Sequence, residues 1–184
     1  GLDFHDFNHV PETVQVDYGS HHPMDRRHRH RRRTQEDADK VRQFTTYPRI
    51  QTHEQIRVRF VTDILEGRRG ESDETDAQID YIIQRALPAA AQLWSQHLSV
   101  IPVQESIQIT ESMCFGAFGA RLAQRTVEDA DLVVIVSGQD FLWQPDGSTT
   151  AVCEEFSLAV GSSCVLDQWD RPLVGFVNFC LGPQ

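Results

Sequence analysis

The 184-residue sequence has no long apolar run. No segment approaches the roughly 18 consecutive apolar residues that a membrane-spanning helix requires. The amino terminus also lacks the basic and then apolar order of a signal peptide. Because the chain begins with Gly1 rather than Met, we expect it to be incomplete at this end. Hydrophobic residues make up 40% of the sequence and charged residues 24%, which is typical of a globular domain with one core.

Several enzyme motifs are also absent. The segment Gly161–Cys164 does not have the Gly-x-Ser-x-Gly spacing of a hydrolase elbow, and Phe115–Ala120 is too short for a dinucleotide fingerprint. Two histidines one helical turn apart, with a glutamate between them, occur nowhere in the chain. His53 and His97 stand alone in sequence, and we expect both to be structural. These absences argue against a complete catalytic site of any of these kinds.

Cysteines are absent from the first 113 residues, and all four lie in the last 71. Their spacing matches no Cys-x-x-Cys motif of a zinc or redox site. An even number in one region favours two disulfides and an oxidising compartment, with four buried free thiols as the alternative. Four cysteines allow three pairings, and spacing alone does not choose among them.

Positive charge is scarce outside one segment. The net charge is −10, yet the run His21–Arg33 holds six of the seventeen basic residues and one of the 27 acidic ones. The rest of the chain is therefore strongly acidic and should repel nucleic acid. Four histidines of the run lack a scaffold that would fix metal geometry, so we expect no functional metal site there; they are His21, His22, His28 and His30.

Residues 1–50 show neither a strand nor a helix period, and we expect a leader that is largely extended or disordered. The fold is expected to occupy residues 51–184. A half-buried strand is predicted at Ile56–Val61, where apolar residues alternate with arginines. Apolar residues then recur every three or four positions from Ile79 to Leu98, which predicts an amphipathic helix capped at Thr75 or Asp76 and kinked or split at Pro88.

The remaining strands are predicted from short apolar runs. The unbroken run Leu132–Val136 predicts a central strand covered on both faces. Val100–Val103 and Ile107–Ile109 read as arms of a strand or hairpin, and Gln139–Thr150 reads as a surface loop. The last two strands are predicted at Phe156–Val160 and Leu173–Phe179.

Five segments, taken in order, resemble the leishmanolysin family of zinc metallopeptidases. The most informative is Cys164–Cys180, CVLDQWDRPLVGFVNFC, which resembles the cysteine, polar turn and strand that precede the active-site helix of that family. The others are Ile82–Gln104, Cys114, Asp129–Gly138 and Ser157–Cys164, and together the resemblance covers about residues 56–184. The resemblance implies an α+β fold, namely a zincin-like amino-terminal subdomain with a twisted mixed sheet and one backing helix.

The resemblance also implies a function. We expect the amino-terminal part of a zinc-dependent metalloendopeptidase acting on protein or peptide substrates, with the zinc bound by a His-Glu-x-x-His helix beyond this chain. This fragment alone should be inactive. The family position of the cysteines implies the pairs Cys114–Cys164 and Cys153–Cys180. The family is secretory, which implies an extracellular or cell-surface location, with membrane association left to regions outside this chain.

A substrate-binding strand follows from the same resemblance. An extended substrate is expected to pair with an exposed edge strand, because such an edge offers free N–H and C=O groups. The residues expected to form that edge are Ser157, Leu158, Ala159, Val160 and Gly161.

The arginine run allows three interpretations: a processing site at Arg31, Arg32 and Arg33, a solvated tail, or a patch that binds polyanions. Processing fits a propeptide boundary between the leader and the first strand. Two functions other than a peptidase also stay open. One is a non-catalytic extracellular binding or adhesion module on the same sheet, and the other is a polyanion-binding protein that uses the arginine arm.

Overall fold

The core of the molecule is built on β7 (Leu132–Ser137), the unbroken apolar strand that the sequence places at the centre. The computed structural model describes residues 11–16, 18, 53–143, 147–153 and 157–182. Within them, β7 lies between β11 (Pro172–Phe179) and β3 (Val58–Val61), parallel to both. Val133, Ile135 and Val136 are fully buried, as expected for a strand covered on both faces.

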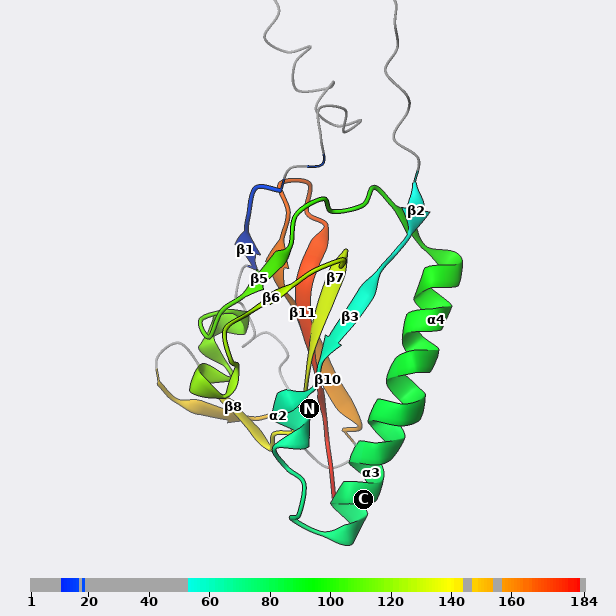
Figure 1. Ribbon diagram of the computed structural model, residues 1–184. Helices are drawn as coiled ribbons and strands as arrows, with labels where there is room; N and C mark the ends of the chain where they lie inside the picture. The colour runs from blue at the N-terminus through cyan, green and yellow to red at the C-terminus, as the bar shows by residue number, and fades with distance from the viewer. Residues whose placement is uncertain (1–10, 17, 19–52, 144–146, 154–156, 183–184) are drawn as a thin grey trace, which may run out of the picture.

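The main sheet has five strands in the order β1-β10-β11-β7-β3 (Figure 1). The strand β10 (Ala159–Leu166) is antiparallel to β11, and β1 (Glu12–Thr13) is parallel to β10. A mixed sheet with one long helical rod is an α+β fold, as the family resemblance implies.

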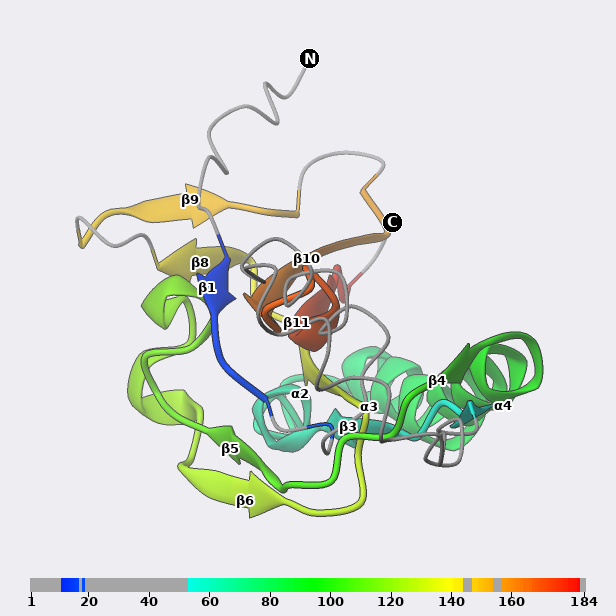
Figure 2. The same cartoon turned by 90° about the horizontal axis from the view of Figure 1, so that it is seen from above.

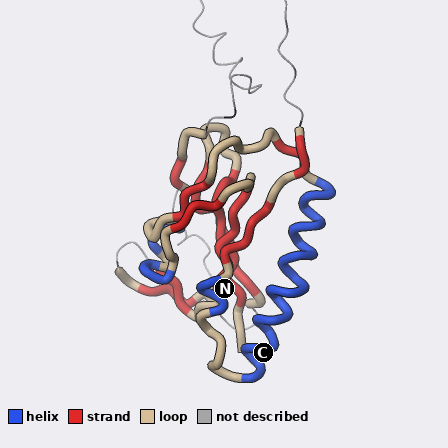
Figure 3. The backbone as a smooth tube through the Cα atoms, in the orientation of Figure 1, coloured by secondary structure: helices blue, strands red, loops and turns tan. Residues whose placement is uncertain are grey.

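The long helical rod packs against one face of this sheet. It runs through α3 (Asp73–Tyr81), a π-helical turn (Ile82–Ala86) and α4 (Leu87–His97), and Figure 3 shows it as one continuous coil. The rod begins earlier than the predicted cap, because the Ser72 side chain accepts a hydrogen bond from the Thr75 amide. Pro88 does not split the rod. Leu87 donates instead to the carbonyl of Ile82, five residues back, so a widened turn accommodates the proline.

Smaller elements complete the described chain. The predicted pairing of Val100–Val103 with Ile107–Ile109 is wrong, because each finds a different partner in the fold. The paired elements are β2 (Glu54–Gln55) with β4 (Ser99–Val100), β5 (Ile107–Ile109) with β6 (Arg125–Val127), and β8 (Phe141–Trp143) with β9 (Thr149–Ala151). Short helical turns lie at α2 (Asp63–Glu66), Cys114–Gly116 and Gly119–Arg121.

Two further predictions need correction. The predicted surface loop Gln139–Thr150 instead contains β8 and the first two residues of β9, which pair as a hairpin. The strand predicted at Phe156–Val160 begins at Ala159 and continues to Leu166, and Phe156 lies outside the described residues. Within the predicted leader the structure describes residues 11–16 and 18, where β1 joins the sheet and Tyr18 is only 2% exposed.

Two apolar clusters lie on the two faces of the sheet. The cluster on the helical side contains Leu65, Ile79, Ile82 and Leu87 packed against Val134 and Val136. The larger cluster lies on the opposite face, where residues 101–122 and the β8–β9 hairpin cover Val133, Ile135, Val174 and Phe176. No helix within the described ranges is long and apolar enough to span a bilayer.

Candidate functional site

The outer edge of β10 is the first candidate for a binding site. On its inner side β10 pairs with β11 from Ala159 to Leu166. On its outer side β1 reaches only Val165 and Leu166, and Figure 2 shows β1 lying beside β10. Among the described residues, the segment Ala159–Ser163 therefore has no strand on its outer side. Such an edge presents backbone donors and acceptors that an extended peptide can pair with.

Small residues line one face of this open segment. Ala159, Gly161 and Ser163 lie opposite Phe179, Val177 and Gly175 of β11, on the side of the sheet that faces the helical rod. A Cβ at Gly161 would lie 2.8 Å from the Phe176 carbonyl oxygen, so only glycine fits this close approach of the two backbones. The open edge therefore has little side-chain bulk that would obstruct an incoming backbone.

The predicted edge residues are only partly within β10. Ala159, Val160 and Gly161 belong to the strand, whereas Ser157 and Leu158 precede it. Leu158 still continues the ladder, because its carbonyl accepts from the Cys180 amide at 2.9 Å. Its side chain is 68% exposed and lines an open groove of about 430 Å³ with Tyr81 and Phe179.

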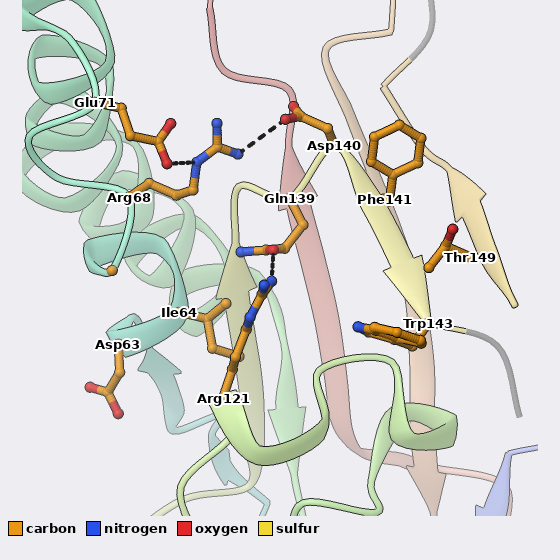
Figure 4. Close-up of a pocket in the computed structure, with 11 residues that line it drawn as sticks. Asp63, Ile64, Arg68, Glu71, Arg121, Gln139, Asp140, Phe141, Trp143 and Thr149 are labelled. Atoms are coloured by element: carbon orange, nitrogen blue, oxygen red, sulfur yellow. Dashed lines mark hydrogen bonds and ion pairs between the residues drawn. The ribbon is translucent and has the colours of Figure 1, made fainter. Parts of the chain in front are cut away.

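A second pocket, of about 770 Å³, lies where the parallel strands β3 and β7 end. This is the end of a parallel sheet at which ligands commonly bind. Figure 4 shows Arg68 between Glu71 and Asp140, with Phe141 and Trp143 on the same side of the pocket as Asp140. The Arg68 guanidinium donates to Glu71 at 2.5 Å and lies 3.6 Å from Asp140, and the bond to Glu71 raises the pKa of Arg68.

Several polar groups of this pocket are paired with one another or with a neighbouring residue. Arg121 donates to Gln139, and Asp63 forms an ion pair with Arg125. The apolar wall is exposed, since Phe141 is 58% and Trp143 50% accessible while Leu142 between them is buried. The sequence offered one signal for this pocket, namely three apolar residues in a segment that otherwise reads as a surface loop.

At the opposite end of the sheet, where β3 and β7 begin, buried charged groups surround Asp131. Its carboxylate is fully buried and accepts from Arg57 Nε at 2.8 Å and from the Val103 amide at 2.7 Å. Arg171 lies 3.3 Å away. Burial alone would raise the pKa of Asp131, but the hydrogen bonds from Arg57 and Val103 outweigh it and lower that pKa.

Asp167 occupies a similar position at the end of β10. It is 1% exposed and accepts from the backbone amides of Trp169 at 2.7 Å and Arg171 at 2.9 Å. The Tyr18 hydroxyl donates to its other oxygen at 2.5 Å. Burial, followed by the bond to Asp167, raises the pKa of Tyr18, so the phenol stays a neutral donor near neutral pH.

Two disulfides tie these elements together. Cys114 pairs with Cys164, and Cys153 pairs with Cys180, as the family positions imply. The first joins the turn at Cys114–Gly116 to the middle of β10. The second joins the end of the β8–β9 hairpin to the end of β11. Cys164 lies inside β10 rather than after it.

The described residues do not fit zinc. No group of three or more His, Cys, Asp or Glu side chains comes together in them, and all four cysteines are in disulfides. His21, His22, His28 and His30 lie outside the described ranges, as do Arg31, Arg32 and Arg33.

The described part of the chain is an α+β domain with a mixed sheet, one long helical rod and two disulfides. The model of the leishmanolysin family matches residues 66–181, and the chain belongs to that family. Leishmanolysins are metalloproteases. No curated protein sequence matches the chain.

Proposed function

We propose that this chain supplies the sheet and the substrate-binding edge of a zinc-dependent metalloendopeptidase that hydrolyses peptide bonds in proteins. One observation carries the proposal: the outer side of β10 has no strand from Ala159 to Ser163 in the described part of the chain. Membership of a family of proteases supports a peptide as the ligand of this edge. Ser157 and Leu158 extend the proposed contact toward the groove beside Tyr81.

The two disulfides support an extracellular or cell-surface location reached through the secretory pathway, because such bonds persist in oxidising compartments. Processing at Arg31, Arg32 and Arg33 stays a prediction.

We further infer that the zinc ligands lie outside these 184 residues, since the sequence has no His-Glu-x-x-His and the described side chains converge on no donor set. The purified chain should therefore contain no stoichiometric zinc and should not digest casein. Metal analysis and a casein assay measure both. One tightly bound zinc together with casein hydrolysis would show that the ligands are within the chain.

Amide hydrogen exchange tests the edge itself. A soluble decapeptide of alternating Lys and Val should slow exchange in Ala159–Ser163, because the peptide backbone covers amides that face solvent in the free chain. Exchange in Val174–Val177, already paired on both sides, should not change. Fragment-resolved mass spectrometry of deuterated protein provides the readout.

The matched control is the same peptide N-methylated at alternate residues, which keeps the side chains but removes backbone donors along one edge. It should protect Ala159–Ser163 much less. If both peptides protect equally, or if neither protects this segment at saturating concentration, strand pairing at β10 is not the mode of binding.

A further inference from the structure

The segment formed by residues 11–16 and 18 contacts the rest of the chain in three ways, one after another along its length. The first is strand pairing. Glu12 and Thr13 of β1 lie opposite Val165 and Leu166, and the Val14 amide donates to the Leu166 carbonyl at 2.9 Å. Val14 and Val16 also pack against the larger apolar cluster.

The second device is a side-chain clamp that continues the pairing beyond the end of β10. The Gln168 amide group donates to the Val16 carbonyl at 2.8 Å and accepts from the Val16 N–H at 2.9 Å. One glutamine thus satisfies both backbone groups of Val16, as a neighbouring strand residue would.

The third device is a buried tyrosine. Tyr18 is 2% exposed, its hydroxyl donates to Asp167 at 2.5 Å, and the Arg171 guanidinium lies 5.6 Å from the centre of its ring. Asp167 is itself buried and held by two backbone amides. A buried aromatic ring that also donates to a buried carboxylate combines apolar burial with a charge-assisted hydrogen bond.

We propose that β10 and the turn at Asp167–Arg171 form a binding site for a Val-x-Val-x-Tyr sequence, occupied by Val14, Val16 and Tyr18 of the same chain. Residues 11–18 then stay bound when the chain is cut between Tyr18 and His53. The inference concerns binding alone and does not depend on the proposed peptidase function.

This site divides the edge of β10 into two parts. The leader segment takes Val165 and Leu166, and the proposed peptide edge is Ala159–Ser163. A cut at Arg31–Arg33 therefore does not by itself uncover the end of β10, and the two ligands lie end to end along one strand.

A full chain with a recognition sequence for a site-specific protease inserted between Arg33 and Thr34 tests the inference. A fluorophore on the amino group of Gly1 reports release of the leader through its anisotropy after complete cleavage. We expect the anisotropy to stay high at about 10 µM protein, where a Kd of about 1 µM keeps roughly three quarters of the leader bound.

Substitutions then identify the anchor. Tyr18→Phe removes only the hydroxyl and should weaken the cleaved complex about tenfold, whereas Tyr18→Ala also removes the ring and should weaken it about 100-fold or more. Tyr81→Ala is the matched control, since Tyr81 is 65% exposed on the helical rod and should leave leader binding unchanged.

A synthetic peptide of residues 10–19 provides a measurement that needs no substitution. It should displace the labelled leader from the cleaved protein, and the same peptide with Phe in place of Tyr18 should displace it about tenfold less well. A fall in anisotropy to the free-leader value on cleavage at 10 µM would overturn the proposal. Retention that is equal in the Tyr18→Ala chain, or that the peptide does not compete with, would also overturn it.

Discussion

The two ends of the main sheet differ in burial and in the kind of side chain that they carry. At the end where β3, β7 and β11 begin, buried charges pair across the strands, with Asp131 and Asp167 almost fully enclosed. At the end where these strands finish lie two open hollows with exposed aromatic residues. We call these the closed end and the open end.

We expect the closed end to contribute mainly to stability and the open end mainly to binding. Removing a partner from a buried carboxylate that accepts several hydrogen bonds strongly destabilises the folded state. We therefore expect the closed end to hold the strands in their relative positions. Phe141, Trp143 and Leu158 are exposed, so we expect them to contribute little to folding and to be accessible to a partner. The strand β10 crosses between the two: Cys164 and Val165 are buried toward the closed end, whereas Ala159 and Gly161 are exposed toward the open end.

Removing the charge at the closed end should have the largest effect. Asp131→Asn keeps the shape of the side chain but leaves Arg57 and Arg171 without their buried carboxylate, and should lower the free energy of unfolding by about 3 kcal/mol at pH 7. Asp129→Asn is the matched control, because the Asp129 side chain is 63% exposed and pairs with arginine at the surface. It should cost about 1 kcal/mol or less. Urea unfolding measures both.

The same pair of variants gives a pH signature. Because the folded-state pKa of Asp131 is lowered, its contribution is fully present above its unfolded pKa of about 3.9 and is lost as pH falls toward the lower folded value. The destabilisation caused by Asp131→Asn should therefore shrink as pH falls below about 4. A destabilisation that stays constant or grows in acid would mean that Asp131 is not held as a carboxylate in the folded protein.

The elements with a strong local pattern were predictable from sequence. Leu132–Val136 has no polar interruption, and Leu173–Phe179 is a β-rich run after a turn, so both strands were placed correctly. The helical rod followed from its apolar spacing. Its cap was misplaced because Ser72, Thr75 and Asp76 are all good caps, and only packing selects one of them.

Contacts between distant segments were not predictable from the residues alone. The strand β10 is rich in Gly, Ser and Ala, so its apolar pattern is too weak to show its full length. The two residues of β1 are too few to show an apolar pattern. A nearby contact that holds this segment is the hydrogen bond from Tyr18 to Asp167, 149 residues away in sequence. The disulfide pairing was available only from the family resemblance, since four cysteines allow three pairings.

The smallest effect on stability is expected at the open end. Phe141 and Trp143 lie on the exposed face of β8, opposite Ala151 and Thr149 of β9. Phe141→Ser and Trp143→Ser should each change the free energy of unfolding by about 1 kcal/mol or less.

Leu142, between them in sequence, is the matched control because it points into the larger apolar cluster and is 1% exposed. Leu142→Ala should cost about 2–5 kcal/mol through the cavity that it leaves. Thermal and urea unfolding of the three variants compares the two faces of one short strand. If Trp143→Ser proved as destabilising as Leu142→Ala, the aromatic wall would be a structural contact, and the open end would lose its distinction from the closed one.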